Sequence, residues 1–298
     1  MRAVVLGAGG QLGAELVSEL RRRGHEVFGF GRHEINITSA PAVKAALSRY
    51  APNWVINSAA YNQVDVAERE PEVAMNINGL AVRSLAVISR KIGATLMHFS
   101  TDHVFDGAKP DPYTEEDMPN PPSAYAISKL AGEFFARAYS DRWYIVRVAG
   151  VFGPAGRYTN RGNFPELILK KAEQSQTLRV VDDFFASPTY APALASRAID
   201  LFDKAPHGLY HIGGGITVSW YEYALKILAA AGLEADIRPT NHREYPTPAA
   251  RPKHAGLSNG KIEKLGIAKM PPLEEALKEY MGIRNRMPPP GTVVDSYR

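Results

Sequence analysis

The stretch Val5-Leu6-Gly7-Ala8-Gly9-Gly10-Gln11-Leu12-Gly13 decides the fold, because three glycines spaced three apart follow an apolar run and open a helical pattern. Gly7 permits a tight turn, Gly10 lets the main chain approach a diphosphate, and Gly13 allows a helix to pack closely on a strand. The N–H groups at the start of the helix then face the anion. A strand, a turn and a helix in this order predict a dinucleotide-binding unit.

Short apolar runs continue this pattern over the first 150 residues. They are too continuous for strands with one exposed face, and they alternate with amphipathic helical segments. The expected strands are 3–6, 27–30, 54–56, 95–99 and 144–148, and the expected helices are 12–23, 41–50, 72–91 and 123–139. This alternation predicts an α/β fold with a Rossmann-type, doubly wound parallel sheet.

The regular spacing ends after Val148. Segments 153–163 and 239–254 are rich in Gly, Pro, Asn and aromatic residues, and they are candidate substrate loops. Strand-like segments 178–181 and 209–212 predict that the chain returns to the sheet between these loops. The expected domains are a dinucleotide-binding domain of residues 1–148 and about 178–212, and a smaller, discontinuous nucleotide-sugar domain of about 149–177 and 213–298.

Composition limits the classes of function. The 298 residues are 45% hydrophobic and 22% charged, which is typical of a globular chain with a sizeable core. Lys and Arg number 35 against 31 Asp and Glu, and the dense basic run Arg21-Arg22-Arg23 lies at an expected helix end, where cations oppose the dipole. Nucleic acid is therefore not an expected partner.

The sequence also limits the compartment. It contains no cysteine, which excludes disulfides, thiolate nucleophiles and Cys-ligated metals and suits a reducing environment. No apolar run approaches the ~18 residues of a membrane span, and a strand pattern follows Met1-Arg2 directly, without room for a signal peptide. These features predict a soluble cytoplasmic protein without a membrane partner.

Tyr125 and Lys129 stand four residues apart in the expected helix 123–139, so their side chains share one face. A nearby ammonium group favours the phenolate and lowers the pKa of a phenol toward working pH. An isolated Tyr-x-x-x-Lys pattern is typical of an exposed helix face. Downstream of a glycine fingerprint and a fourth strand, it predicts a catalytic pair.

Residues 99–107, Phe-Ser-Thr-Asp-His-Val-Phe-Asp-Gly, begin at the carboxyl end of the expected fourth strand, where open α/β sheets bind ligands. A hydroxyl at Ser100 or Thr101 can donate a hydrogen bond to a carbonyl oxygen while Tyr125 delivers a proton, as ketone reduction requires. The acidic residues and the histidine of this segment suit a turn beside glycine. We expect no metal site here.

These residues resemble the extended short-chain dehydrogenase/reductases and, within them, the dTDP-4-dehydrorhamnose reductases. The resemblance covers nearly the whole chain, and the order of its segments is more specific than any one glycine motif. The segments are Gly10 to Gly13, Asn57 to Tyr61, Ser100 to Gly107, Gly162 to Phe164, Ser187 to Thr189, Gly208 to His211, Ser219 to Glu222 and Arg251-Pro252.

The resemblance implies NAD(P)H-dependent reduction of the 4-keto group of a dTDP-4-dehydro-6-deoxy sugar, first of all dTDP-4-dehydrorhamnose to dTDP-L-rhamnose for polysaccharide. By position, Thr101 would bind the keto oxygen, Tyr125 would protonate it, and Lys129 would hold the nicotinamide ribose. The implied cofactor contacts are Gly7, Gly10, Gln11, Leu12, Gly13, Asn57, Ala59, Ala60, Tyr125 and Lys129. The implied substrate contacts are Thr101, Asp102, Val104, Phe105, Asn163 and Arg251.

Arg32 bears on the choice of cofactor. It follows the second expected strand, where an NAD-selective site places an acid that accepts hydrogen bonds from the ribose 2′-OH. Its guanidinium can pair with the 2′-phosphate of NADP. The alternatives are a solvated loop arginine or neutralisation by Glu34. NADPH is therefore the expected cofactor, with NADH as a second that the site accepts.

The sequence departs from the family pattern in expected substrate segments. Ala149 stands where the family has an aromatic residue against the sugar, so the pocket is expected to be wider or to be filled by Tyr158, Phe184 or Phe185. The other departures are Asn62, Gln63, Phe184 and Ala255. A different 4-keto nucleotide-sugar therefore stays open as the substrate.

Two further functions share this fold. A non-catalytic regulatory subunit would not need Thr101, Tyr125 and Lys129 together, which argues against that class. A dehydratase or epimerase is disfavoured because dehydratases place an Asp-Glu pair where this sequence has Asp102-His103. The sequence leaves the oligomeric state open, with a homodimer as one option.

Overall fold

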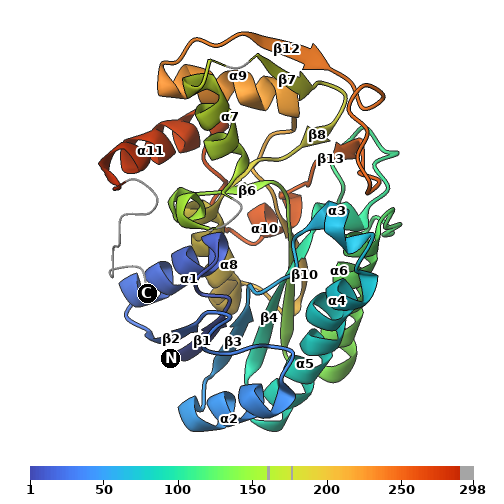
Figure 1. Cartoon of the computed structure of the whole chain (residues 1–298). Helices are drawn as coiled ribbons and strands as arrows, with labels where there is room; N and C mark the ends of the chain where they lie inside the picture. Colours follow the sequence, from blue (N-terminus) through green and yellow to red (C-terminus); the bar gives the residue numbers. More distant parts are fainter. Residues whose placement is uncertain (160–161, 176, 289–298) are drawn as a thin grey trace.

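The computed structural model describes residues 1–159, 162–175 and 177–288. Its main sheet has six parallel strands in the order β10-β5-β4-β3-β1-β2 (Figure 1). They are β1 (Arg2–Leu6), β2 (Glu26–Phe30), β3 (Trp54–Asn57), β4 (Thr95–Thr101), β5 (Trp143–Val148) and β10 (Gly208–Ile212). The order runs outward from β1 in both directions, which confirms the predicted doubly wound α/β sheet.

Helices cover both faces of this sheet (Figure 1). On one face lie α1 (Gln11–Arg22) and α8 (Ala191–Lys204), and on the other lie α2 (Ala40–Tyr50), α5 (Ala81–Lys91) and α6 (Ala124–Tyr139). Alternate strand residues point to opposite faces. Val5 and Phe99 accordingly belong to one buried cluster, and Val4 and Leu96 to the other.

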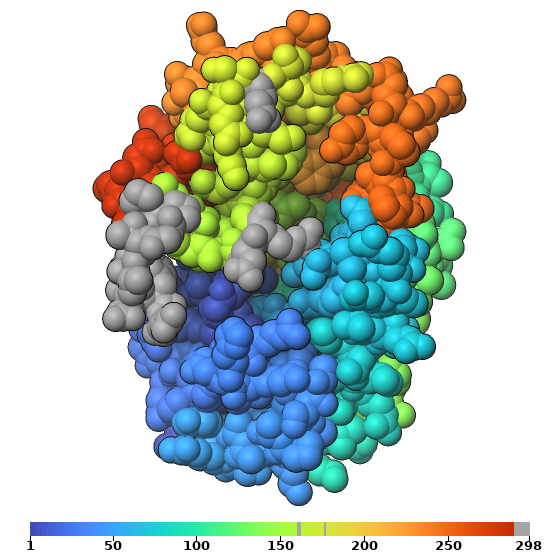
Figure 2. Space-filling model, viewed as in Figure 1, coloured from blue at the N-terminus to red at the C-terminus, as the bar shows by residue number. Residues whose placement is uncertain are grey.

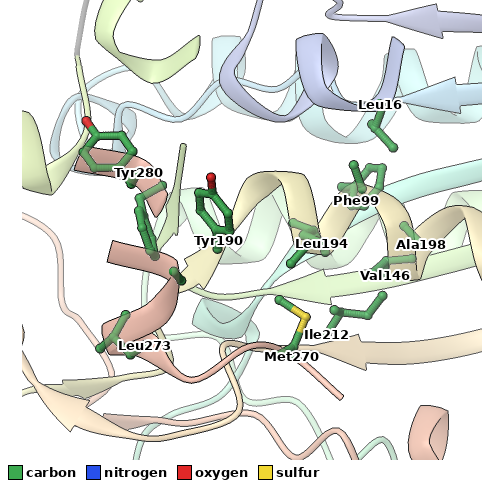
Figure 3. Close-up of a cluster of buried hydrophobic side chains, with 14 of the residues drawn as sticks. Leu16, Phe99, Val146, Tyr190, Leu194, Ala198, Ile212, Met270, Leu273 and Tyr280 are labelled. Atoms are coloured by element: carbon green, nitrogen blue, oxygen red, sulfur yellow. The ribbon is translucent and has the colours of Figure 1, made fainter. Parts of the chain in front are cut away.

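Figure 3 shows how the first of these clusters closes. Leu16 of α1 and Leu194 of α8 face Phe99 and Val146 of the sheet, and all four side chains are buried. Apolar spacing also predicts helices near 191–202 and 220–231, with Ser39 or Thr38 as the cap of helix 41–50. The structure has helices at Ala191–Lys204 and Trp220–Ala231, and the Ser39 hydroxyl accepts from the Ala42 N–H. Apolar spacing located these elements because burial on one face is its direct consequence.

The expected helix 72–91 contains a π-helical turn. Residues Pro71–Met75 form α4, Asn76–Leu80 form the wider turn, and α5 follows directly. Inside this turn, the Asn78 amide donates to the Tyr61 carbonyl (3.0 Å) and to the Ser128 hydroxyl (3.0 Å) and accepts from the Tyr61 N–H (2.8 Å). The turn thus fastens α6 to the chain that follows β3. Such turns recur at functional sites, but apolar periodicity does not reveal them.

Short strands and loops pack above the main sheet. The sheets pair β7 (Leu178–Val181) with β12 (Ile237–Thr240), β6 (Val151–Phe152) with β9 (Thr189–Tyr190), and β8 (Phe185–Ala186) with both β11 (Val218–Ser219) and β13 (His254–Ala255). The remaining helices are α3 (Val64–Ala67), α7 (Phe164–Glu173), α9 (Trp220–Ala231), α10 (Gly260–Lys264) and α11 (Leu273–Arg286). Figure 1 shows α7, α9 and α11 grouped with β7 and β12 on this side.

One strand prediction is wrong. Segment 178–181 forms β7, but this strand pairs with β12 and does not return to the main sheet. Segment 209–212 does return, as β10 beside β5. A short, mostly apolar run predicts a strand but does not indicate which strand it pairs with, so the pattern alone could not distinguish the two cases. The division into two domains stays a prediction.

The end of α1 explains the basic run of the sequence. Arg21 and Arg22 lie in the last turn of α1, and Arg23 pairs with Asp200 of α8 (2.7 Å), which confirms a structural role for the basic run. Residues 287–291 read Met-Pro-Pro-Pro-Gly, a run that predicts an irregular segment, and residues 289–291 of it lie outside the described residues. Among the described helices, none is long and apolar enough to cross a bilayer.

Candidate active site

The glycine turn has the predicted geometry. Gly7 adopts a positive φ of 82°, and its carbonyl accepts from the Gly10 N–H (2.9 Å). A Cβ on Gly13 would lie 2.1 Å from the Gly7 carbonyl oxygen, and one on Gly7 would lie 2.6 Å from the Ala59 nitrogen. Only glycine fits at both positions. The turn therefore presents the N-terminus of α1 at the edge of the sheet, with Leu12 packed against the core.

Strand register gathers the expected site residues at one edge. Leu6 pairs with Asn57, Asn57 with His98, and Thr101 with Val148, so the strands end side by side. Figure 2 shows a hollow between the N-terminal part, coloured blue to cyan, and the part coloured yellow-green to orange. A separate cavity of about 280 Å³ is lined by Pro112, Ile216, Thr217 and Leu257 among others. Its lining includes none of the expected catalytic residues, so we place the chemistry at the strand ends.

Asn57 is fully buried at the end of β3. Its amide contacts His98 Nδ1 (3.1 Å) and accepts from the Ala59 N–H (3.2 Å). Burial, aided by Lys129, holds the pKa of His98 well below its usual range, so the ring is neutral and can accept at Nδ1. The Asn57 side chain is thus engaged inside the protein, and half-buried Ala59 and Ala60 carry the more accessible main chain here. His98 is not among the residues that the sequence motifs indicate, and its signal in the sequence is a polar side chain within an apolar strand.

Tyr125 and Lys129 lie on the first two turns of α6. The Ser123 hydroxyl caps this helix by accepting from the Ala126 N–H (3.3 Å). Lys129 is 3% exposed, and its Nζ donates to the Phe99 carbonyl at the end of β4 (2.6 Å). Burial lowers the pKa of Lys129 to about 8, against the opposing effect of Glu133. Lys129 is thus a buried ammonium group on the face of α6 that packs against β4, and its catalytic role stays a prediction.

Thr101 ends β4 and faces a buried acid. Its hydroxyl donates to Asp102 Oδ1 (2.9 Å) and accepts from the His103 N–H (3.2 Å). Burial raises the pKa of Asp102. A substrate oxygen that accepts from the Thr101 hydroxyl would take the place of Asp102 Oδ1 as the acceptor. The His103 ring meets the Tyr125 ring edge-on, with 5.7 Å between the ring centroids, so the segment that follows β4 lies against the start of α6.

The side chains of Val104 and Phe105, which the resemblance placed against the substrate, are buried in the protein. They are 0% and 1% exposed, and Phe105 stacks on Tyr113 at 4.0 Å. A contact between this segment and a substrate would therefore come from its main chain. Ala149 is buried in the same cluster with Leu257.

The expectation about the space beside Ala149 is consequently wrong. Ala149 is 1% exposed and belongs to one buried cluster with Val104, Phe105, Tyr113 and Leu257, so no open space lies beside its side chain. Phe184 contacts His242, Phe185 stacks on His254, and the Tyr158 hydroxyl donates to the Pro288 carbonyl. The cluster recruits a tyrosine 36 positions earlier, which no local pattern could indicate.

Asn163 and Arg251 both have partners within the chain. Arg251 pairs with Asp65 (2.7 Å) and donates to the Ala249 carbonyl (3.2 Å). Asn163 caps α7 by accepting from the Glu166 N–H (3.0 Å), and its Nδ2 donates to Gln11 Oε1 (2.9 Å). Arg251 is half-buried and can exchange Asp65 for a ligand anion.

Arg32 is exposed after β2. Glu34 accepts from the Gly31 N–H (2.7 Å), so this carboxylate is occupied by the main chain. Across the part of the chain that the structure describes, no ion pair is found for Arg32. Its guanidinium is therefore available to an anion. Within the same described ranges, no cluster of three or more His, Asp and Glu residues is arranged to hold a metal ion.

Comparison with known proteins assigns the chain to a family. Residues 1–285 match the family described as the RmlD substrate binding domain. The chain belongs to this family. It is accordingly an NAD(P)-dependent reductase of the RmlD type, as the resemblance implied.

Relatives of the RmlD family match almost end to end. The chain is 39% identical to the spore coat polysaccharide biosynthesis protein SpsK of Bacillus subtilis, over 95% of this chain and 98% of that protein. It is 35% identical to the dTDP-4-dehydrorhamnose reductase of Streptomyces griseus, over 93% and 92%. The crystal structure of the dTDP-4-dehydrorhamnose reductase of Bacillus anthracis in complex with NADP superposes with a TM-score of 0.89 at 33% identity, over 94% and 98%.

Proposed function

We propose that this reductase uses NADPH to reduce the 4-keto group of a dTDP-4-dehydro-6-deoxy sugar, first of all dTDP-4-dehydrorhamnose, to the alcohol. The observation that carries the proposal is the meeting of Thr101, Tyr125 and Lys129 where β4 ends beside α6. Two relatives named dTDP-4-dehydrorhamnose reductase, one in complex with NADP, support the substrate class and the cofactor.

The residues at the glycine turn fit a dinucleotide. The main chain at Gly7 and Gly13 approaches so closely that a Cβ would fill the cradle, and α1 begins there with its N–H groups unpaired by side chains. Bound NADPH supplies the hydride. Half-buried Ala59 and Ala60 border the same cradle, because Ala59 is the residue that a Cβ on Gly7 would meet.

The chain's own residues supply the proton and the polarity. Thr101 donates a hydrogen bond to the keto oxygen, and the Tyr125 hydroxyl delivers a proton to that oxygen as negative charge develops on it. Lys129, protonated below a pKa of about 8, stabilises the phenolate that remains. The Phe99 carbonyl fixes the ammonium group at 2.6 Å, so its charge is held in place beside the site.

The identity of the sugar is the finer part of the proposal. SpsK has a name that refers to spore coat polysaccharide, and Ala149 lies where the family resemblance expects an aromatic residue. A different 4-keto nucleotide-sugar is the second candidate substrate. The protein is incubated with NADPH and, in separate assays, with dTDP-4-dehydrorhamnose and with other 4-keto nucleotide-sugars. The decrease in nicotinamide absorbance measures the oxidation of NADPH in each assay.

We expect the highest kcat/KM with dTDP-4-dehydrorhamnose. A higher kcat/KM with another nucleotide-sugar would show that this other sugar is the substrate, and the assignment as a 4-keto reductase would stand. Binding of NADP⁺ and dTDP without oxidation in the presence of any of these sugars would overturn the enzyme assignment and favour a regulatory subunit.

A further inference from the structure

One glutamine joins the glycine turn to the segment above the sheet. Gln11 is the first residue of α1, and its side chain bonds to three residues of the segment formed by residues 151–159 and 162–163. Its Nε2 donates to the Val151 carbonyl (2.7 Å), and its Oε1 accepts from the Gly153 N–H (3.1 Å) and from Asn163 Nδ2 (2.9 Å). Both acceptor sites of the amide oxygen are therefore used on this segment.

Asn163 completes the junction from the other side. Its Oδ1 caps α7 through the Glu166 N–H (3.0 Å), and the Tyr280 hydroxyl of α11 lies 3.4 Å from the same oxygen. Its Nδ2 donates to both Gln11 Oε1 and the Gly153 carbonyl (3.1 Å). These partners fix the orientation of both amides, because a flip of either would place donor against donor or acceptor against acceptor.

Gly156 lies against both amides. A Cβ at this position would lie 1.9 Å from Gln11 Oε1 and 2.6 Å from Asn163 Nδ2. The turn Pro154–Tyr158 therefore has room for the Gln11–Asn163 bond only with glycine at 156. The junction joins the glycine turn to two elements that are distant from it in sequence but close to each other: the turn after β6 and the start of α7.

We propose that Gln11 is a positioning residue whose side chain couples the cofactor turn to residues 151–159 and Asn163, so that cofactor and nucleotide-sugar bind cooperatively. The inference rests on the proposed function. The main chain at Gln11 faces the expected diphosphate of the cofactor, while the Gln11 side chain binds the segment. When one ligand orders this junction, the second ligand loses less binding free energy to ordering it. The family resemblance implied that Gln11 contacts the cofactor and Asn163 the substrate, whereas in the structure their side chains form a hydrogen bond with each other.

The coupling is measured by calorimetry on the intact protein. The Kd of dTDP is determined without NADP⁺ and with saturating NADP⁺, and the ratio of the two values is the coupling. We expect at least about fivefold tighter dTDP binding with NADP⁺ in the wild type. In Gln11→Ala the ratio should fall below about twofold.

A second variant separates coupling from helix capping. Asn163→Ser keeps a hydroxyl that can cap α7 but lacks the amide that reaches Gln11. Its ratio should fall as in Gln11→Ala, and the double variant should lose no more than either single variant. Asn53→Ala removes an amide that accepts from the Arg2 N–H (2.8 Å), far along the sheet from this junction, and should keep the wild-type ratio.

The outcomes distinguish the inference from the function on which it rests. Independent binding of NADP⁺ and dTDP in the wild type would overturn the coupling alone. So would additive effects, with Gln11→Ala weakening only NADP⁺ and Asn163→Ser weakening only dTDP. Failure of the wild type to bind either ligand would overturn the proposed function as well.

Discussion

The main sheet and the short strands above it are ordered by different means. All seven residues of β4 are buried, and six of them pair in register with β5. Above the sheet, strands of two to four residues are supplemented by side-chain bonds such as Arg179 with Glu244 and His242 with Asp183. Both regions bury apolar side chains, but the main sheet has long strand pairings, whereas short-strand residues such as Leu178 and Tyr190 lie in short pairings that are supplemented by individual polar contacts. Local unfolding should therefore begin in the second region, where ligands are expected to bind.

The sharpest test compares one ion pair from each region. Arg147 of β5 makes two hydrogen bonds to Glu133 of α6 (2.9 and 2.7 Å), and the two side chains are 3% and 4% exposed. Arg147→Met leaves Glu133 as an unpaired buried charge, so we expect the free energy of unfolding to fall by about 3–5 kcal/mol. Arg179→Met removes a pair whose side chains are 58% and 52% exposed and should cost at most about 1 kcal/mol.

Urea denaturation of the two variants beside the wild type gives both numbers. Equal losses would contradict the comparison, because they would mean that the exposed pair above the sheet is as important as the buried one. A double variant that also removes the charge of Glu133 should recover part of the loss, since no uncompensated charge is then buried.

Catalysis is expected to depend on one phenol at the boundary of the two regions. Tyr125→Phe should leave the fold and NADP⁺ binding nearly unchanged and lower kcat by about 100-fold or more, the scale of a lost acid catalyst. Tyr139→Phe, in the last turn of the same helix, is the matched control and should retain activity. A Tyr125→Phe variant with near wild-type kcat would remove Tyr125 from the mechanism.

The sequence predicted the features of the main sheet better than the contacts of the segments above it. The glycine turn, the parallel strands and the Tyr125/Lys129 face depend on spacing within one element, and spacing is visible in a sequence. The partner of β7 and the neighbours of Ala149 depend on residues far away in the chain. The Gln11–Asn163 junction spans 152 positions and involves two ordinary amides, so no local pattern marks it.

We expect the buried ammonium group of Lys129 to lower the free energy of unfolding at neutral pH. Burial lowers its pKa from 10.5 to about 8, so between these values the unfolded chain binds more protons and stability rises with pH. Below pH 8 the folded state carries the full cost of a buried ammonium group. Lys129→Met should therefore raise the free energy of unfolding at pH 7 by about 1–3 kcal/mol, and this gain should vanish above pH 10.5.

Thermal or urea unfolding of Lys129→Met at pH 7 and at the highest pH that both proteins tolerate measures this difference. The same variant should bind NADP⁺ more weakly and lose most of its turnover. A destabilised variant at pH 7 would show that the bond to the Phe99 carbonyl contributes more than desolvation costs.

Arg251 links the two regions by a contact that a ligand can replace. It is held by Asp65, which follows β3, and its guanidinium can grip phosphate oxygens in bidentate fashion. Arg251→Ala should weaken dTDP binding by about tenfold, whereas Arg238→Ala, at an exposed pair with Asp236, should change nothing. Competition titration with dTDP measures both variants, and equal affinity of Arg251→Ala and wild type would exclude the phosphate role.

The smallest expected effect lies at the far end of the cofactor site. Arg32 is exposed after β2, and Glu34 is occupied by the Gly31 N–H, so the guanidinium is free to meet the 2′-phosphate of NADP. Because solvent screens an exposed pair, the contact should contribute only about 1 kcal/mol, which is a several-fold preference for NADPH over NADH. The ratio of kcat/KM for the two cofactors should therefore exceed one in the wild type and approach one in Arg32→Ala. A ratio that survives the substitution would place the discrimination elsewhere, and equal use of both cofactors in the wild type would mean that the main sheet carries a cofactor site without selectivity.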